Sequence, residues 1–408
     1  MFLKTQTNQN IENYTSALKA IGAFSNLFSS SDKPFIQYRV AENAFCKAFS
    51  ADNLARADVA YDAIINGCGI GIKTFVLSGS SKIEKVAEFN SRSSELRILK
   101  GLDLARKLAD FRNERIEFAD RVYNTQNRVY HIIGRDKFLI KVFEIPYDLI
   151  DKDSIEILDE TKSSLKFKDA LNEYNFNFSK SVLMKRFIIP KECIEIAVEI
   201  LEEPINVLLN LTQPGSGKEA DFENQKQLQN TIGLLTDEEL IPFVDYVILP
   251  LYSPEAKKKL KEPIVPVKSQ LNQWNAGGRK RDPGEVYISI PSKIRNNAPD
   301  FFPEKDVIFN LRIPNGKILS AKVCQDGSKA LMTNPNKAMA DWMLRDVLML
   351  KENELLTYDK LRKTGYDSVK ITKSTNDDYF IDFTKLDEYE SFIEKVSENQ
   401  DGQFKLSL

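Results

Sequence analysis

The sequence predicts an α+β protein built from two domains. Its 408 residues exceed what one compact core usually holds. The hydrophobic pattern also changes along the chain, from helical periodicity over 1–55 to short strands with tight turns over 285–385. We therefore expect an N-terminal α/β domain with extra β-hairpins at 1–250, a linker at 251–268 and a mostly β domain at 269–408.

Composition restricts the class of protein. With 42% hydrophobic and 28% charged residues, the chain has the make-up of an ordinary globular protein. Its longest apolar runs, such as 241–251, contain proline and aspartate and fall short of the roughly 18 to 20 residues that span a bilayer. The sequence turns polar after Leu3 and shows no apolar export segment there. We expect a cytoplasmic protein that does not associate with membranes.

Cysteine and histidine usage narrows the chemistry. The four cysteines stand singly in the sequence, without the close pairs of a zinc site or a disulfide framework. His131 is the single histidine, and its apolar neighbours are typical of a core residue. Mechanisms that need two imidazoles are excluded. Carboxylates and lysines are therefore the expected catalytic groups.

The N-terminal region predicts a helix followed by a β-hairpin. In 36–49 the apolar residues recur at three- and four-residue steps, as in an amphipathic helix. Two strand-like runs, 57–65 and 69–77, flank Asn66-Gly67, the strongest short signal for a tight turn. Helical periodicity returns at 81–90 and 95–119.

The remaining elements are mostly short strands. Two further hairpins are expected from the runs 129–133 with 138–143, and 164–168 with 173–178. In the C-terminal domain we expect an amphipathic helix at 337–349 and strands at 285–290, 307–313, 318–323, 368–372 and 379–383.

Charge is unevenly distributed, although the net charge is only -2. Residues 256–295 contain ten Lys or Arg and three Asp or Glu, whereas 346–408 contain nine and fourteen. The basic stretch also carries amide side chains and Trp274. Cations bind phosphates, while amides and guanidinium groups read base edges, so this stretch favours contact with nucleic acid. A solvated basic linker is the alternative.

The first hairpin also contains a candidate active site. Asp62 lies on one strand and Lys73 on the returning strand, which is the layout of nucleases with a PD-(D/E)xK motif. The acid expected two residues before the lysine is replaced by Gly71. Since Mg²⁺ needs several oxygen ligands, a second acid must come from elsewhere, and Glu42 on the preceding helix and Asp58 are the candidates. A surface ion pair across two strands is the alternative interpretation.

The C-terminal sequence resembles a known family over about residues 265–395. The stretch KSQLNQWNAGGRKRDPGEVYISIP, together with the segment from NAPDFFPEKD to ADWMLRDVL, is similar to the B3-type DNA-recognition domain of restriction endonucleases of the EcoRII, BfiI and NgoAVII kind. This resemblance implies a seven-stranded pseudobarrel with two arms that enter the major groove. The implied DNA-binding residues are Gln273, Asn275, Arg279, Lys280 and Arg281 on the N-terminal arm, and Gln325, Asp326, Ser328, Lys329, Asn334 and Asn336 on the C-terminal arm.

The N-terminal half is similar to the PD-(D/E)xK domains of type II restriction enzymes. The segments YRVAENAFCKAF, DAIINGCGIGIKTF and KVAEFN carry this resemblance over about residues 35–90. It implies Mg²⁺ as cofactor, held by Asp62, Glu42 and Asp58, with Lys73 as the catalytic lysine. Lys180, Lys185 and Arg186 are expected to touch the DNA backbone.

Together the two resemblances imply a site-specific endonuclease that cleaves double-stranded DNA by Mg²⁺-dependent hydrolysis. Two alternatives stay open: an endonuclease that requires 5-methylcytosine, and a non-catalytic, sequence-specific DNA-binding regulator. The recognition sequence, the cut position and the oligomeric state, including a homodimer, stay open as well.

Overall fold

The chain divides into two compact units. The computed structural model describes residues 1–54, 59–212, 243–374 and 378–398. The first unit comprises residues 1–117 and 125–238, and the second comprises 118–124 and 239–408. The division therefore falls near the end of the long helix α4 (Gly101–Tyr123), whose last residues belong to the second unit.

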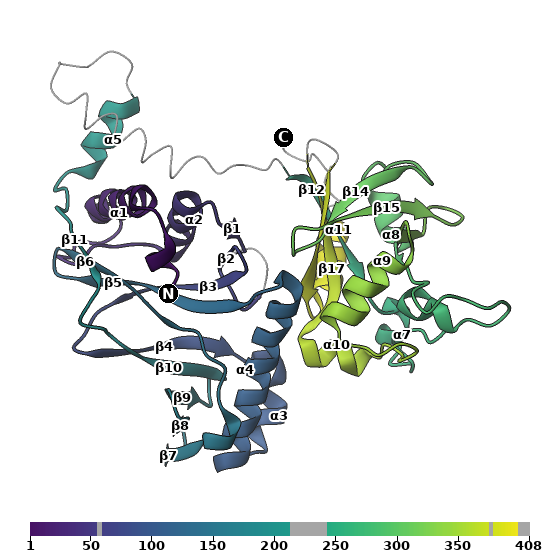
Figure 1. Cartoon of the computed structure of the whole chain (residues 1–408), viewed down its shortest axis with the longest axis horizontal. Helices are drawn as coiled ribbons and strands as arrows, with labels where there is room; N and C mark the ends of the chain where they lie inside the picture. Colours follow the sequence, from purple (N-terminus) through teal and green to yellow (C-terminus); the bar gives the residue numbers. More distant parts are fainter. Residues whose placement is uncertain (55–58, 213–242, 375–377, 399–408) are drawn as a thin grey trace. The chain divides into compact units, whose positions relative to one another are not determined.

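The first unit contains a six-stranded mixed sheet (Figure 1). Its only parallel pair among the described strands is β3–β5, and the chain segment between these strands includes α4. Asn66 and Gly67 both have positive φ, 48° and 71°, so the predicted Asn-Gly turn joins β2 and β3. In spatial order the strands are β1 (Asp52–Asn53), β2 (Ala63–Ile65), β3 (Cys68–Val76), β5 (Asn127–Asp136), β6 (Leu139–Pro146) and β11 (Ile194–Ala197).

Helices α1 (Asn8–Ala23) and α2 (Tyr38–Phe49) pack on this sheet. Thr7 and Gln37 cap their N-termini by accepting hydrogen bonds from backbone N–H groups one turn on. Aromatic residues of both helices form one core with the aliphatic side chains of β3, β5 and β6. His131 lies in this core, fully buried, with Nε2 2.8 Å from the Tyr14 hydroxyl. The predicted structural role of His131 is confirmed.

The first unit also contains a five-stranded antiparallel sheet packed against α4. In order its strands are β4 (Ser81–Glu88), β10 (Val182–Ile188), β9 (Glu173–Asn177), β8 (Ser164–Lys168) and β7 (Glu156–Glu160). The prediction of a helix at 81–90 is wrong, because this segment pairs along its length with β10. The short helices of this unit are η1 (Leu3–Thr5), η2 (Ser25–Leu27), η3 (Asn90–Arg92), α3 (Ser93–Arg97), η4 (Lys152–Ser154) and α5 (Pro204–Thr212).

The second unit is built on a seven-stranded sheet that is nearly closed into a barrel. Strands β12 and β13 end the hydrogen-bonded order, and they also approach each other. The single parallel pair among its described strands is β14–β18. In order the strands are β12 (Phe243–Pro250), β17 (Tyr366–Ser374), β18 (Tyr379–Lys385), β14 (Ile308–Arg312), β15 (Ile318–Cys324), β16 (Ala330–Thr333) and β13 (Ile288–Ser289).

Short helices and the end of α4 complete the second unit. Phe118 of α4 stacks on Tyr366 with ring centroids 4.4 Å apart, and Tyr123 donates a 2.6 Å hydrogen bond to Asp382. The predicted helix at 337–349 is present but partly π-wound. The helices are α7 (Pro254–Lys258), η5 (Gln270–Asn275), α8 (Ser292–Asn297), α9 (Lys337–Met339), η6 (Ala340–Val347), α10 (Tyr358–Thr364) and α11 (Glu388–Glu398).

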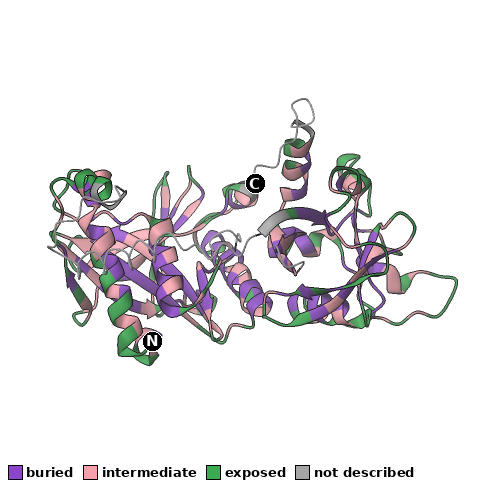
Figure 2. Cartoon of the chain, turned by 90° about the horizontal axis from the view of Figure 1, so that it is seen from above, coloured by how far each residue is buried: buried purple, intermediate pink, exposed green. Residues whose placement is uncertain are grey.

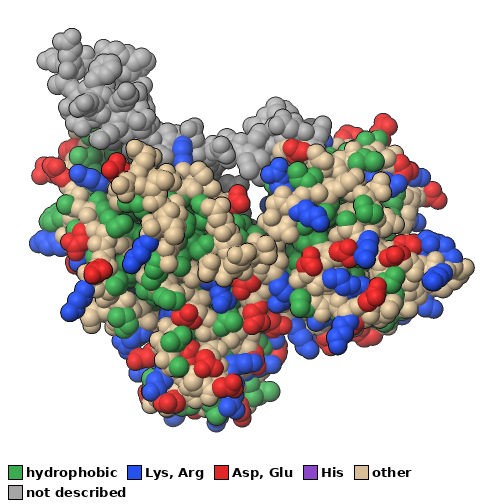
Figure 3. All heavy atoms as spheres, viewed as in Figure 1, with side chains coloured by type: hydrophobic (Ala, Val, Ile, Leu, Met, Phe, Trp, Pro, Cys, Tyr) green, Lys and Arg blue, Asp and Glu red, His purple; other side chains and the backbone are tan. Residues whose placement is uncertain are grey.

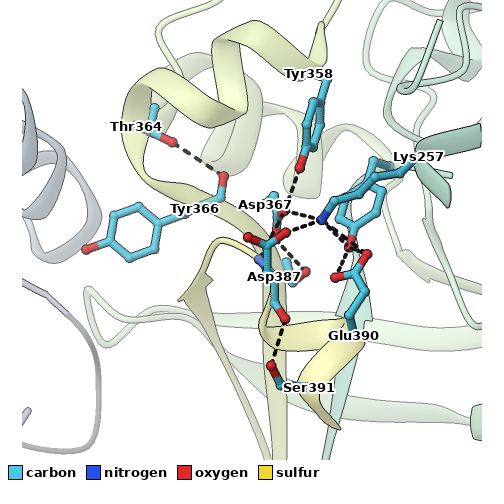
Figure 4. Close-up of polar contacts among 10 residues, drawn as sticks. Lys257, Tyr358, Thr364, Tyr366, Asp367, Asp387, Glu390 and Ser391 are labelled. Carbon is cyan, nitrogen blue, oxygen red and sulfur yellow. Dashed lines mark hydrogen bonds and ion pairs between the residues drawn. The ribbon is translucent and has the colours of Figure 1, made fainter. Parts of the chain in front are cut away.

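The segment predicted as a linker, 251–268, is part of the second unit. Lys257 connects this segment to the C-terminal part of the unit, because its ammonium lies 3.2 Å from Asp367, 2.7 Å from Asp387 and 3.1 Å from Glu390 (Figure 4). Asp367 is fully buried, so this lysine compensates a carboxylate inside the unit. The same contacts remove Lys257 from the cations available to nucleic acid.

No helix among the described residues is long and apolar enough to cross a membrane.

Candidate active site and candidate nucleic-acid interface

Three of the predicted catalytic residues come together in the first unit. Asp62 directly precedes β2, and its carboxylate Oδ2 accepts a 2.7 Å hydrogen bond from the backbone N–H of Ile72 on β3. Lys73 is the next residue on β3, and Glu42 is on α2. The three charged groups lie within electrostatic range, since Asp62 and Lys73 both perturb the pKa of Glu42.

The two carboxylates are desolvated and repel each other. Burial raises the pKa of Glu42, and the charge of Asp62 raises it further, to about 7, although Arg39 and Lys73 act in the opposite direction. Burial likewise raises the pKa of Asp62, against the lowering effects of Lys73 and of the Ile72 N–H. Paired carboxylates with raised pKa values beside a lysine are a functional arrangement more often than a stabilising one.

Gly69 and Gly71 lie where any side chain would meet a buried tyrosine ring. A Cβ on Gly71 would lie 2.9 Å from the Tyr147 ring and 3.0 Å from the Tyr130 ring, and a Cβ on Gly69 would lie 2.7 Å from Tyr61. Tyr130 and Tyr147 are buried and stack with their centroids 3.8 Å apart. An acid at position 71 is therefore sterically excluded.

The described residues supply two of the three predicted metal ligands. Asp58, the third, lies outside the described residues. Among the described residues no group of three or more His, Cys, Asp or Glu side chains could hold a metal ion. The chemistry of Glu42 and Asp62 nevertheless fits a divalent cation, because hard carboxylate oxygens that repel each other gain most from a shared positive charge.

Glu84 on β4 is a carboxylate near the site that the sequence analysis missed. Burial raises its pKa, while Lys82, Lys73 and Arg135 lower it, so the Glu84 carboxylate lies within electrostatic range of Lys73. No motif spacing links position 84 to the hairpin, because β4 belongs to the other sheet of the unit. The chain connects β3 to β4 through residues 77–80, and the sequence pattern predicts a helix, not a strand, for the segment that carries Glu84.

The residues predicted to touch the DNA backbone from the first unit differ in accessibility. Lys180 is exposed, and Arg186 forms a 2.6 Å ion pair with Glu173. Lys185 is only 1% exposed, with its ammonium over the rings of Tyr130 and Phe187. The Lys185 side chain occupies a core position in the alternating pattern of β10, so in this structure it is not exposed to a partner.

The predicted N-terminal arm of the second unit consists of the end of η5 and the long loop between η5 and β13. The loop projects from the unit in Figure 1, and its tip is exposed in Figure 2. Residues 277–280 of this loop are all exposed. Asn275 is exposed and donates to the Val267 carbonyl, 3.0 Å away. Lys280 is exposed as well. The side chains of Gln273, Arg279 and Arg281 instead converge on one acceptor, Glu285.

The predicted C-terminal arm consists of two turns on either side of β16. The turn before the strand uses positive φ at Gln325 and Ser328, 67° and 54°, and leaves Asp326 and Lys329 exposed. The turn after the strand exposes its two asparagines. The members of this arm are Gln325, Asp326, Ser328, Lys329, Asn334 and Asn336.

The two arms approach each other at their bases. A Cβ on Gly284, at the end of the N-terminal arm, would lie 3.0 Å from the Cα of Lys337, next to Asn336 of the C-terminal arm. Residues separated by some 50 positions in the sequence therefore present polar side chains from neighbouring loops. On the face of the second unit shown in Figure 3, Lys and Arg are interspersed with Asp and Glu. That face is therefore not uniformly basic.

Comparison with known proteins identifies the second unit. Residues 252–375 match the family model described as the NgoFVII C-terminal B3-like DNA-binding domain, and this stretch contains both arms and strands β13 to β17. The predicted resemblance to a B3-type domain is confirmed, and the nearly closed barrel fits it. No curated protein matches the chain. The chain thus carries a DNA-binding domain of the restriction-enzyme type, with DNA as its partner.

Proposed function

We propose that this chain is a site-specific endonuclease that hydrolyses phosphodiester bonds in double-stranded DNA with Mg²⁺. One observation carries the catalytic half of the proposal. The charges of Glu42 on α2, Asp62 directly before β2 and Lys73 on β3 interact with one another, in a chain that also carries a restriction-enzyme DNA-binding domain. A surface ion pair would not explain why burial raises the pKa of both carboxylates and why the charge of Asp62 raises that of Glu42 further.

The topology of the first unit supports a PD-(D/E)xK-like nuclease domain. Helix α2 precedes the β2–β3 hairpin, and β3 is followed, after α4, by the parallel strand β5. This order places an acid on a helix, an acid before β2 and a lysine on β3 within one side-chain cluster. The departure from the motif at Gly71 is offset by Glu42.

The roles of the residues follow from their charges. Glu42 and Asp62 would hold Mg²⁺, which would supply positive charge to offset the negative charge of the phosphate. The Ile72 N–H holds the Asp62 carboxylate in place through its 2.7 Å hydrogen bond. Lys73 stabilises the attacking water and the charge that develops on phosphate as the new P–O bond forms and the bond to the leaving sugar oxygen breaks. The stacked tyrosines 130 and 147 form an apolar wall next to the site.

A non-catalytic DNA-binding regulator is the second candidate, and one observation favours it. The tyrosine rings fill the space in which the usual acid of the motif would stand, so the first unit lacks that ligand and cannot regain it without repacking. Under this alternative the raised pKa of Glu42 belongs to a site that has lost its metal.

Digestion of long DNA distinguishes these functions. The full chain is incubated with unmethylated DNA and with DNA carrying 5-methylcytosine, each with Mg²⁺ and with EDTA. We expect discrete fragments in the samples with Mg²⁺ and none in the samples with EDTA, because a sequence-reading DNA-binding domain restricts cleavage to particular sites. Fragments from the methylated DNA only would indicate the methylation-requiring enzyme. Bound but intact DNA in both Mg²⁺ samples would contradict the catalytic proposal and support the regulator.

A further inference from the structure

Glu285 holds most of the N-terminal arm in one arrangement. Its Oε1 accepts hydrogen bonds from Gln273 Nε2 at 2.9 Å, from Arg279 Nη2 at 2.5 Å and from Arg281 Nη1 at 2.6 Å. The residue closes a turn, with its own N–H donating to the Asp282 carbonyl at 2.9 Å. Three side chains predicted to bind DNA therefore share one carboxylate oxygen.

This carboxylate is ionised and shielded. Its side chain is only 10% exposed. Burial alone would raise the pKa of Glu285, but the hydrogen bonds from Gln273 and Arg279 and the charges of the two arginines keep it below its usual value. A buried carboxylate at the base of a DNA-binding loop weakens attraction to phosphate, so a loop selected for phosphate binding alone would not contain one.

The two arginines are held to different degrees. Arg281 is 18% exposed and is fixed at both ends of its guanidinium, since Nε also donates to the Ala276 carbonyl at 3.2 Å. Within the described residues its Nη2 has no protein acceptor, which leaves both N–H groups of that nitrogen for an outside partner. Arg279 is 60% exposed and has only one short contact to the carboxylate. Arg281 is thus preoriented, whereas Arg279 can swing away.

We propose that Glu285 is a specificity-determining residue that positions Arg281 to read a base edge and lowers the affinity of the arm for random DNA. A guanidinium fixed before binding discriminates between bases because it cannot adjust to a wrong one, and it loses little side-chain entropy. The charge of Glu285 cancels one arginine charge, which weakens sequence-independent phosphate binding. The positioning of Arg281 raises the ratio of specific to random affinity, whereas the cancelled charge weakens binding to both kinds of duplex by similar factors. The inference rests on the sequence-reading half of the proposed function and needs no catalysis.

Glu285→Gln tests the inference, with Asp282→Asn as the matched control. Both substitutions remove one negative charge from the same turn, and both keep a side-chain oxygen. Asp282 is exposed and accepts from the Gly284 N–H at 2.7 Å, and no arginine is hydrogen-bonded to it within the described residues. The control therefore changes the charge of the arm without releasing Arg281.

Bound duplexes are first selected from a randomised pool by the full chain in EDTA. The affinities of each variant for the best selected duplex and for a shuffled duplex are then measured across salt concentrations. We expect Glu285→Gln to bind the shuffled duplex more tightly and to lower the ratio of the two affinities at least about fivefold, the loss of one base contact of about 1 kcal/mol. Asp282→Asn should raise both affinities by similar factors and keep the ratio.

A double mutant separates positioning from charge. In an Arg281→Ala background, Glu285→Gln should lower the affinity ratio no further, because the side chain that it positions is gone. Arg281→Lys keeps the charge and removes the fixed fork, so it should lower the ratio even if Glu285→Gln does not fold.

Three results would overturn the inference. Equal changes of the ratio in Glu285→Gln and Asp282→Asn would leave only a charge effect. Additive losses of the affinity ratio in the double mutant would show that Glu285 does not act through Arg281. No enriched sequence with the wild-type chain would overturn the sequence-reading function itself, and the inference with it, which distinguishes that failure from the other two.

Discussion

Glu42→Gln should stabilise the first unit at alkaline pH while removing a ligand of the proposed metal site. The folded protein keeps a proton on Glu42 up to about pH 7, whereas the unfolded chain releases it near pH 4.5. Between these values the folded state binds more protons, so the contribution of Glu42 to stability falls as pH rises. Above about pH 7 the folded wild-type protein carries the full free-energy cost of ionising the buried Glu42 carboxyl. The Gln variant has no ionisable group at this position and is free of that cost.

The size of the effect follows from the pKa. At about 1.4 kcal/mol per pH unit, raising the pKa from 4.5 to about 7 means that ionised Glu42 costs the folded state about 3 kcal/mol. The variant also loses the 3.3 Å ion pair with Arg39, whose side chain is 41% exposed. Such a partly solvated pair contributes less than about 1 kcal/mol. The net expectation is a gain of about 2 kcal/mol at pH 8.

Urea unfolding, monitored through hydrogen exchange of peptides from α2 and β3, measures the stability of the first unit separately. The stability difference between Glu42→Gln and wild type should grow from near zero at pH 4.5 to about 2 kcal/mol at pH 8. The exposed Glu12 of α1 provides the control, Glu12→Gln, which should track the wild type at each pH. A Glu42→Gln variant that is less stable at pH 8, or whose difference does not depend on pH, would refute the arrangement of Glu42 beside Asp62.

Three further predictions concern packing and buried charge. Gly71→Ala should cost about 1 to 3 kcal/mol in thermal or urea unfolding, because the new methyl meets the two stacked tyrosine rings; an unchanged stability would contradict the steric exclusion. Lys185→Met should stabilise the chain by about 2 to 3 kcal/mol at pH 7, because burial and, to a smaller extent, the charge of Arg112 lower the lysine pKa from 10.5 to about 8. This gain in stability should disappear above pH 10.5, where the lysine is neutral in both the folded and the unfolded state. Tyr123→Phe should raise the pKa of Asp382, already raised to about 6 by burial, because the tyrosine hydroxyl stabilises the ionised carboxylate; carboxyl NMR shifts measure this, and an unchanged titration would contradict it.

Local sequence signals predicted local structure well. Asn66-Gly67 specified its hairpin because both residues tolerate positive φ, and the observed values are positive. The core role of His131 followed from its apolar neighbours. The gathering of Glu42, Asp62 and Lys73 followed from a motif whose spacing reflects the geometry of a helix and a hairpin.

Contacts between distant segments were the part that the sequence could not supply. Residues 243–250 fall within the range predicted for the first domain, but they form β12 of the second unit, whose partner β17 lies more than 110 residues later. In the sequence Lys257 is one of the charges of a predicted linker, whereas in the structure its ammonium contacts Asp367 and Glu390. The reason for glycine at positions 69 and 71 could not be read from the sequence, because the tyrosines that fill the space beside these glycines lie on other strands and loops.

Cleavage and binding of one selected duplex, measured side by side, test the division of labour most directly. With Mg²⁺, the wild-type chain should bind and cut this duplex. Lys73→Ala should bind it with unchanged affinity and leave it intact, since Lys73 acts in the first unit. Arg281→Ala should bind it about 5- to 150-fold more weakly, the equivalent of about 1 to 3 kcal/mol. Cleavage by Lys73→Ala at the wild-type rate, or no cleavage by the wild-type chain on a duplex that it binds specifically, would contradict the account.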